Sequence, residues 1–360
     1  MTTNYTIDIM FCELKFPIFA KKITNTLTML KKLFQYGVPF VISVGLCYLL
    51  FTGIDFNEMI ATIKNECNFW WIGLALLISI FSHVFRAMRW DIQLRALDVK
   101  APLMTLVYSI FGTYAVNLVF PRLGEVWRTT YVSQRQNASF TTIFGSMVAD
   151  RLADAVVVAL LTLTTFLLAS GVITQYLAQN TALYNSLIAL LSSPWLWIAI
   201  VAILAVVWWI FAKKRENKFV AKFIGFIQGL WVGFASIAKM KGKGKWLLLT
   251  LAIWGCYFTQ LFVAFFAFEE TTAVVENHGV LAVLVCFALS SIAMGVPSNG
   301  GIGPWQWAVI FGLSIYGMPT DGVSLAFANL VLGTQTLLLI ILGIITFTAI
   351  ALEKRRKVTK

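Results

Sequence analysis

The sequence predicts an all-α polytopic membrane protein. Of its 360 residues, 59% are hydrophobic and only 12% are charged, and the mean hydropathy is +0.82. Soluble domains need about a quarter of charged residues to present a polar surface to water. Several apolar runs also reach the ~20 residues with which a helix crosses a ~30 Å hydrocarbon core. Together these observations assign the chain to the membrane class.

Six apolar runs are long enough to be full spans, and tryptophans at several of their ends favour the headgroup layer. These runs are Leu33–Ile54, Phe69–Met88, Leu152–Ile173, Trp195–Ala212, Trp246–Phe268 and Val323–Leu352. Two further regions are shorter or interrupted. They are Ala101–Phe120 with the charged segment after it, and Val280–Val296 with Ile302–Gly317. We expect these two regions to be re-entrant helical hairpins.

The positive-inside rule supports this topology. With both hairpins entering and leaving by one face, 27 of the 28 Lys and Arg residues fall on the cytoplasmic side, and only Lys64 lies outside. The N- and C-termini are then cytoplasmic, with basic segments at 1–32 and 353–360 around a membrane domain at 33–352. The alternative is eight or more ordinary spans.

The same assignment predicts an inverted-topology repeat. Residues 33–173 read span, span, hairpin, span from the cytoplasmic side, and residues 195–352 repeat that order from the outside. Such repeats are common in secondary transporters. Between the halves, residues 216–240 combine basic residues with apolar positions at helical spacing, which predicts an amphipathic helix on the anionic inner leaflet.

The first candidate site consists of Arg122, Glu125 and Arg128, which follow Pro121 at intervals of three residues. Pro121 suits the first position of a new helix, and this spacing would give the three charges a common face. Glu125 can pair with one arginine and leave the other guanidinium free for a phosphate. The alternative is a solvated loop beside the membrane.

The second candidate site consists of Asp150 and Asp154, which share a helical face at the expected start of the third span, while Arg151 lies about 100° round the axis. These carboxylates could neutralise the arginines of the first hairpin, relay protons or bind Mg²⁺ beside a substrate phosphate. The alternative is a helix N-cap without a further function.

The third candidate site is the segment from Gly295 to Gln306, in which prolines and glycines interrupt the helix. Ser298, Asn299, Gly300 and Gly301 form the turn, and Pro304 can begin a new helix. Interrupted backbone at membrane depth needs protein or a water-filled cavity to satisfy it. Two hairpin tips with exposed helix N-termini would make an anion site. The alternative is an extramembrane loop.

Three motifs resemble one known family. Residues 121–128 (PRLGEVWR), 150–154 (DRLAD) and 297–303 (PSNGGIG) are similar in order and spacing to the lysylphosphatidylglycerol synthetase-like transmembrane family, also called flippase-like domain proteins. The resemblance extends over nearly the whole chain from about Leu33. It implies movement of lipids across the bilayer, as attributed to the membrane half of the multiple peptide resistance factor. Hopanoid- and glycolipid-linked relatives imply that the substrate varies.

Two departures from the family pattern qualify this resemblance. The chain ends in a basic tail where aminoacylating members carry a soluble transferase domain, so lysyl transfer is not expected. Gln306 also replaces a glutamate of many members, and an amide cannot carry a proton. We therefore expect a flippase or scramblase for a phosphate-bearing lipid in a bacterial inner membrane. The alternatives are an enzyme acting on a lipid phosphate and a non-transporting partner of a glycosyltransferase.

The sequence gives little support for binding of nucleic acid, a cofactor or a metal. The net charge of +12 accompanies no basic-aromatic module, so we do not expect nucleic acid as a partner. The five cysteines are scattered and the two histidines, His83 and His278, lie far apart, so we expect neither a cofactor nor a metal. Membrane lipids, including anionic lipids of the inner leaflet, are the expected partners.

Overall fold

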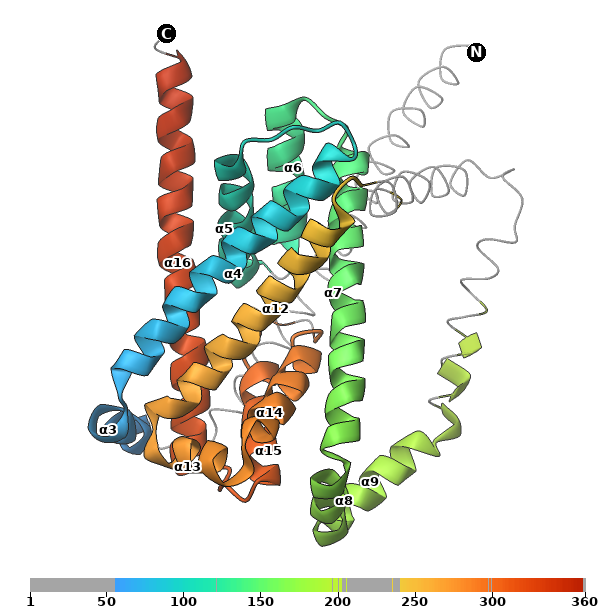
Figure 1. Cartoon of the computed structure of the whole chain (residues 1–360), viewed down its shortest axis with the longest axis vertical. Helices are drawn as coiled ribbons and strands as arrows, with labels where there is room; N and C mark the ends of the chain where they lie inside the picture. The colour runs from blue at the N-terminus through green and yellow to red at the C-terminus, as the bar shows by residue number, and fades with distance from the viewer. Residues whose placement is uncertain are drawn as a thin grey trace, which may run out of the picture.

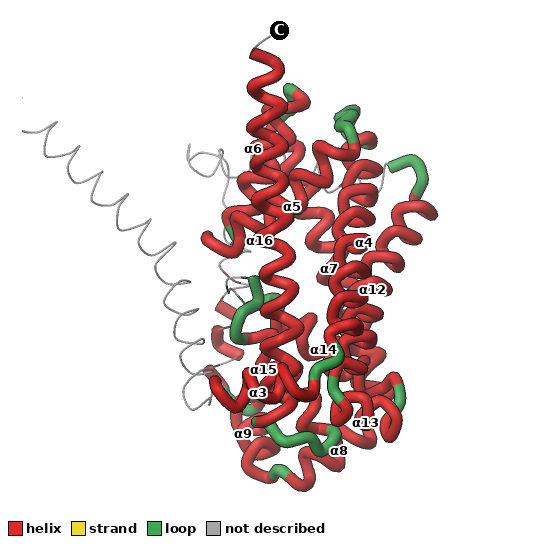
Figure 2. Tube along the Cα trace, turned by 90° about the vertical axis from the view of Figure 1, so that its left-hand side faces the viewer, coloured by secondary structure: helices red, strands yellow, loops and turns green. Residues whose placement is uncertain are grey.

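The computed structural model describes residues 56–120, 122–195, 240–296 and 300–358, together with positions 197–199, 201, 202, 205, 235 and 298. This part of the chain consists of helices and connecting turns, without a strand (Figure 2). The helices are α3 (Phe56–Glu66), α4 (Phe69–Arg95), α5 (Leu103–Val119), α6 (Leu123–Gln136), α7 (Phe140–Leu168), α8 (Ser170–Gln179), α9 (Thr181–Leu191), α12 (Lys243–Ala264), η2 (Phe265–Ala267), α13 (Glu269–His278), α14 (Val280–Ala293), α15 (Pro304–Ile315) and α16 (Gly322–Val358).

Within the described ranges, four helical stretches are long and apolar enough to cross a membrane. They are α4, α7, Lys243–Ala267 and Gly322–Glu353, and α13 with α14 would add a fifth but bend by 111°. All four correspond to predicted spans, so the polytopic membrane class is confirmed. The predicted span Leu33–Ile54, most of Trp195–Ala212 and the predicted amphipathic helix 216–240 lie outside the described residues.

The prediction that the third span begins at Leu152 is wrong. Helix α7 begins at Phe140, so Asp150 and Asp154 lie well inside it and the helix N-cap interpretation fails. The predicted apolar run begins only after Asp150 and Arg151, whereas the helix extends upstream through these charges, which neighbouring helices neutralise. Helix α16 extends to Val358 and so continues into the residues of the predicted basic tail, 353–360.

Two short helical pairs lie toward opposite ends of the structure (Figure 1). Helices α5 and α6 pack together near the end where α4 finishes and α7 begins, and α14 and α15 pack together toward the end where α16 begins. The second pair is close because Gly312 on α15 faces Cys286 on α14, where an added Cβ would lie 2.6 Å from the sulfur. Small residues allow such close approach in membrane helices.

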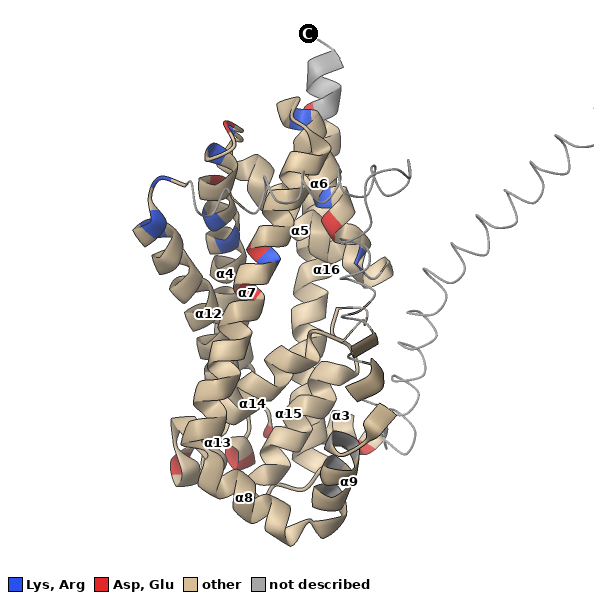
Figure 3. Ribbon diagram, turned by 90° about the vertical axis from the view of Figure 1, so that its right-hand side faces the viewer, with Lys and Arg blue, Asp and Glu red and all other residues tan. Residues whose placement is uncertain are grey.

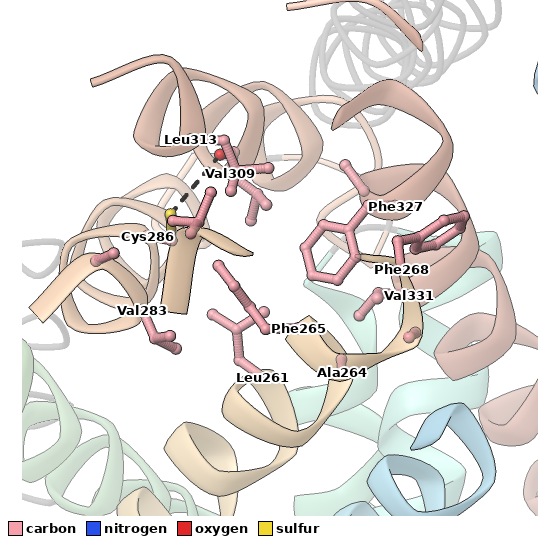
Figure 4. Packing of buried hydrophobic residues seen from close by; sticks show 14 of the residues in the cluster. Leu261, Ala264, Phe265, Phe268, Val283, Cys286, Val309, Leu313, Phe327 and Val331 are labelled. Atoms are coloured by element: carbon pink, nitrogen blue, oxygen red, sulfur yellow. Dashed lines mark hydrogen bonds between the residues drawn. The ribbon is translucent and has the colours of Figure 1, made fainter. Parts of the chain in front are cut away.

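An apolar core surrounds the second pair (Figure 4). Phe265 of η2 and Phe268, which follows η2, pack on Phe327 of α16 with ring centroids 5.1 and 6.4 Å apart. Val283 and Leu313 from α14 and α15 belong to the same buried cluster. Helix α4 packs along α12 over most of its length (Figure 1). This packing holds one face of α4 against α12 while its arginines contact α7.

The charges of the described chain divide between the two ends (Figure 3). Lys and Arg, drawn in blue, gather toward the end that carries the C-terminus, whereas Asp and Glu, drawn in red, occur toward both ends. Arg95 and Arg135 lie in the last turns of α4 and α6 and Lys243 begins α12, while α13 carries Glu269 and Glu270. The distribution matches the charge asymmetry that the positive-inside argument uses.

Candidate functional site

Two arginines of α4 and two aspartates of α7 form a buried ion network. Arg86 and Arg89 lie one turn apart on α4, and Asp150 and Asp154 lie one turn apart on α7. The guanidinium of Arg89 contacts both carboxylates at 2.7 and 2.8 Å, and that of Arg86 lies 2.6 Å from Asp154. The arginine side chains are at most 4% exposed. Breaking such a pair leaves an uncompensated buried charge, at a cost of about 3–5 kcal/mol.

Helix α12 supplies neutral partners to the same network. The guanidinium of Arg86 donates to the hydroxyl oxygen of Tyr257 at 3.3 Å, and Arg89 donates to the hydroxyl of Thr250 at 3.4 Å. Three helices therefore meet at these four charges. Buried charges need such additional hydrogen bonds because water does not solvate them.

The role of the aspartates differs from the sequence-based alternatives. Their ion pairs are with Arg86 and Arg89 of α4, whereas neither carboxylate forms an ion pair with Arg122 or Arg128 of the first hairpin within the described residues. Both carboxylates already contact guanidinium groups, and the described residues contain no group of three His, Cys, Asp or Glu side chains that could hold a metal ion.

Arg86 and Arg89 are the residues that the sequence reasoning missed. Arg86 and Arg89 are three residues apart, and the two aspartates are four residues apart. Either spacing places two side chains on one face of a helix. The positive-inside count places them on the cytoplasmic side, because they lie at and just beyond the end of the predicted run Phe69–Met88. A search for complementary charge pairs at helical spacing would have found them.

Glu125 is positioned by α5 and α7. Its carboxylate lies 3.3 Å from the guanidinium of Arg151 and 3.3 Å from the side-chain nitrogen of Asn117. The Asn117 oxygen in turn accepts a hydrogen bond of 2.7 Å from the backbone N–H of Gly124. The expected pairing of Glu125 with Arg122 or Arg128 is therefore wrong, and the ion pair instead joins α6 to α7.

Arg122 precedes α6 and does not belong to it. Its φ of 64° lies in the left-handed region, where residues other than glycine are uncommon, and the helix begins at Leu123. Pro121, expected to open the helix, lies outside the described residues. The predicted common helical face of Arg122, Glu125 and Arg128 is thus wrong, because Arg122 lies in the turn before the helix that carries the other two.

The turn at Arg122 contacts the interruption between α14 and α15. The Arg122 guanidinium donates a hydrogen bond of 2.8 Å to the carbonyl oxygen of Gly295. At Gly300, whose φ is +65°, an added Cβ would lie 2.8 Å from the side chain of Leu118 at the end of α5. The first and third candidate sites therefore meet at their tips.

The remaining residues of the third site satisfy the turn itself. Ser298 donates a hydrogen bond of 3.4 Å to the carbonyl of Val296, Gly301 has a φ of +88°, and Asn299 lies outside the described residues. The predicted interruption and the helix that begins at Pro304 are confirmed. The Gln306 oxygen accepts from the backbone N–H of Gly303 at 2.7 Å, and its nitrogen donates to Asn329 at 2.6 Å. Gln306 therefore caps α15 and ties it to α16.

Within the part of the chain that the structure describes, Arg128 is the one charge of these motifs without an ion pair or a hydrogen-bond partner. Its side chain is 0% exposed, and its guanidinium carbon lies 3.7 Å from the ring centroid of Trp90. None of its three guanidinium nitrogens meets a hydrogen-bond acceptor among the described residues. A cation–π contact is worth about 2 kcal/mol when desolvated, whereas an unsatisfied buried donor costs about 1–3 kcal/mol and more when charged. The arrangement can bind an anion.

Comparison with known proteins finds a membrane-protein family and a related membrane protein. Residues 38–343 match the family described as the lysylphosphatidylglycerol synthase TM region. A UPF0104 membrane protein from Pyrococcus horikoshii is 22% identical over 254 residues, which cover 64% of this chain and 73% of that protein. No solved structure matches the chain.

Proposed function

Since the chain belongs to the lysylphosphatidylglycerol synthase transmembrane family, we propose that it is a flippase or scramblase that moves a phosphate-bearing lipid between the two leaflets. A phospholipid, an aminoacyl-phospholipid and a lipid-linked glycan precursor are the candidate substrates. The proposal includes residence in a bacterial inner membrane and anionic lipids of the inner leaflet as partners. A lipid-modifying transferase is a further candidate partner.

One observation carries the proposal. Two short helical pairs, which lie toward opposite ends of the structure, touch through Arg122 and Gly295. Helical interruptions at a contact of this kind, close to buried charge, are the arrangement in which secondary transporters hold a substrate at the bilayer midplane. In the proposed mechanism, the two pairs are re-entrant hairpins that alternate in opening toward each leaflet.

The proposed orientation follows from charge. The basic end, with Arg95, Arg135 and Lys243, faces the cytoplasm, and the acidic end, with Glu269 and Glu270, faces outward. Both termini are then cytoplasmic, and six spans with two hairpins form the inverted repeat of 33–173 and 195–352. The order of a long helix, a helical pair and a long helix in α4 to α7 supports the repeat, because α12 to α16 follow the same order with η2 and the short α13 inserted after α12.

The buried charges provide the proposed path for the headgroup. Arginines pair with phosphate through two parallel hydrogen bonds, which makes them suited to hold a lipid phosphate in a dry environment. Arg122 lies where the tips of the two helical pairs meet, whereas Arg128 lies in the interior of the protein, next to Trp90. A lipid-phosphate enzyme with Asp150 and Asp154 as metal ligands gains no support, because both carboxylates already bind arginine.

The test is transport by purified protein in vesicles. A lipid labelled on its acyl chain is reconstituted with the protein, and the fraction accessible to an impermeant quencher is followed over time. The protein should accelerate exchange between leaflets over protein-free vesicles, and Arg122→Ala and Glu125→Ala should each slow it. Arg95→Ala is the matched control, because Arg95 pairs only with Asp91 on the same helix at an exposed position. Transport unchanged by both site variants would refute the assigned site.

A further inference from the structure

The charges around α6 are satisfied unequally. Within the described residues, three carboxylates lie in this cluster, the buried Asp150 and Asp154 and the partly exposed Glu125, and each already contacts a guanidinium. The shortest ion pairs are Asp150 with Arg89 at 2.7 Å, Asp154 with Arg86 at 2.6 Å and Glu125 with Arg151 at 3.3 Å. A fourth arginine, Arg128, has neither an ion pair nor a hydrogen-bond acceptor among these residues. The cluster therefore carries one positive charge more than its carboxylates neutralise.

The surroundings of Arg128 hold its side chain in place without neutralising it. The ring of Trp90 lies 3.7 Å from the guanidinium carbon, and the indole N–H of Trp90 is fixed by a hydrogen bond of 3.1 Å to the hydroxyl of Ser146. An aromatic face attracts a cation but accepts none of the directed hydrogen bonds that the five N–H groups of a guanidinium can donate. These donors match the oxygens of a phosphate.

We propose that this cluster selects a lipid whose headgroup has a net negative charge, with the phosphate at Arg128, and that it rejects a net cationic aminoacyl-phospholipid. This inference rests on the proposed transport function. An ammonium group of a lysyl headgroup needs a free carboxylate, and all three are engaged with arginine. It would also lie among four guanidinium groups, and like charges in such proximity exclude the wrong ligand.

Access to Arg128 requires a change of conformation. The side chain is 0% exposed, so the headgroup reaches it only when α6 moves away from Trp90 on α4. Such an opening is part of any mechanism that carries a headgroup between leaflets. A phosphate monoester or diester of a lipid and free phosphate offer the same oxygens, and the experiment must separate these two sources.

The test compares two lipids in one transport assay. Phosphatidylglycerol and lysyl-phosphatidylglycerol with the same labelled acyl chain are reconstituted separately with wild-type protein. We expect phosphatidylglycerol to exchange at least about tenfold faster, because like-charge contacts strongly disfavour the cationic headgroup. Arg128→Gln should reduce this ratio toward one, and Arg128→Lys should retain part of it. Arg135→Gln, on the same helix but paired with Glu353, is the matched control and should leave the ratio unchanged.

A binding measurement separates the possible failures. Thermal unfolding of the solubilised protein is measured with phosphatidylglycerol, lysyl-phosphatidylglycerol or inorganic phosphate. We expect phosphatidylglycerol alone to raise the melting temperature, and Arg128→Gln to remove that shift. Equal transport of both lipids, or faster transport of the lysyl lipid, would overturn the inference and leave the transport function intact. A shift with phosphate alone would overturn the lipid assignment. An Arg128-dependent shift without any lipid transport would refute the proposed function but retain the anion site.

Discussion

The guanidinium of Arg122 donates a 2.8 Å hydrogen bond to the carbonyl oxygen of Gly295, which lies 173 positions later in the chain. The bond joins the turn before α6 to the end of α14. It is a charge-assisted bond to a backbone group that the interrupted helix leaves without an intrahelical partner. The tips of two helical pairs are thereby held together, and the stability and movement of this contact can be tested directly.

Cross-linking the two tips should stop transport. In a cysteine-free background, Arg122→Cys and Gly295→Cys can be joined by a flexible bis-maleimide that contains a reducible disulfide. We expect efficient linkage, detected as a linked peptide by mass spectrometry, and recovery of transport to the level of the unlinked double variant after reduction. Arg122→Cys with Gly322→Cys is the control, since Gly322 begins α16 at the far end. Undiminished transport by the linked protein would show that the tips need not separate.

Arg89→Gln should strongly destabilise the protein. The substitution leaves Asp150, whose side chain is 0% exposed, without its 2.7 Å ion pair, and the expected loss is about 3–5 kcal/mol. Unfolding in detergent, followed by chemical denaturation, measures this change. The control Arg95→Gln removes an ion pair whose arginine is 59% exposed and should cost less than about 1 kcal/mol. Arg89→Met with Asp150→Leu should cost less than Arg89→Gln, and a larger loss would contradict this account of the network.

Gly312→Ala should loosen the contact between α14 and α15. The added Cβ would lie 2.6 Å from the sulfur and 3.0 Å from the Cα of Cys286, and overpacking of this kind costs about 1–3 kcal/mol. Thermal unfolding should show the loss, and Cys286→Ala in the same chain should restore only part of it. Gly255→Ala on α12 meets nothing within 4 Å and should be neutral or stabilising by up to about 1 kcal/mol.

Asn117→Ala should impair both folding and transport. The side chain accepts from the Gly124 N–H at 2.7 Å and donates to Glu125 at 3.3 Å, so its loss leaves two groups less satisfied, at about 1–3 kcal/mol. Asn117→Asp should be more harmful for transport, because it sets a second carboxylate against Glu125. Asn180→Ala, which removes an exposed bond to the Tyr176 carbonyl, is the control for both unfolding and vesicle assays. Equal effects at both positions would contradict a special role for Asn117.

Local sequence pattern was enough to predict the elements whose structure depends on neighbouring residues alone. The start of α4 at Phe69, the span of α12 and the long apolar helix α16 agree with the predicted runs, because helix hydrophobicity reports directly on membrane insertion. The interruption before Pro304 was also predictable, since glycine and proline act within a few residues. By contrast, the start of α7 was misplaced, because its two aspartates are neutralised by arginines more than fifty positions away.

The partners of the charges could not be predicted from spacing alone. Glu125 pairs with Arg151 and not with an arginine of its own motif, because the turn at Arg122 and the packing of α6 against α7 set their relative rotation. Arg86 and Arg89 find their aspartates only because α4 packs along α12 and presents one face to α7.

The sequence by itself determined the membrane class, the family, most of the spans described here and the two places where helices are interrupted, since composition and short-range propensity decide these. Only the tertiary structure decided which buried charges neutralise one another and that Arg128 contacts the ring of Trp90 without a hydrogen-bond acceptor among the described residues. Ion pairs act over a few ångströms, so they depend on the rotation and depth of helices that are distant in sequence.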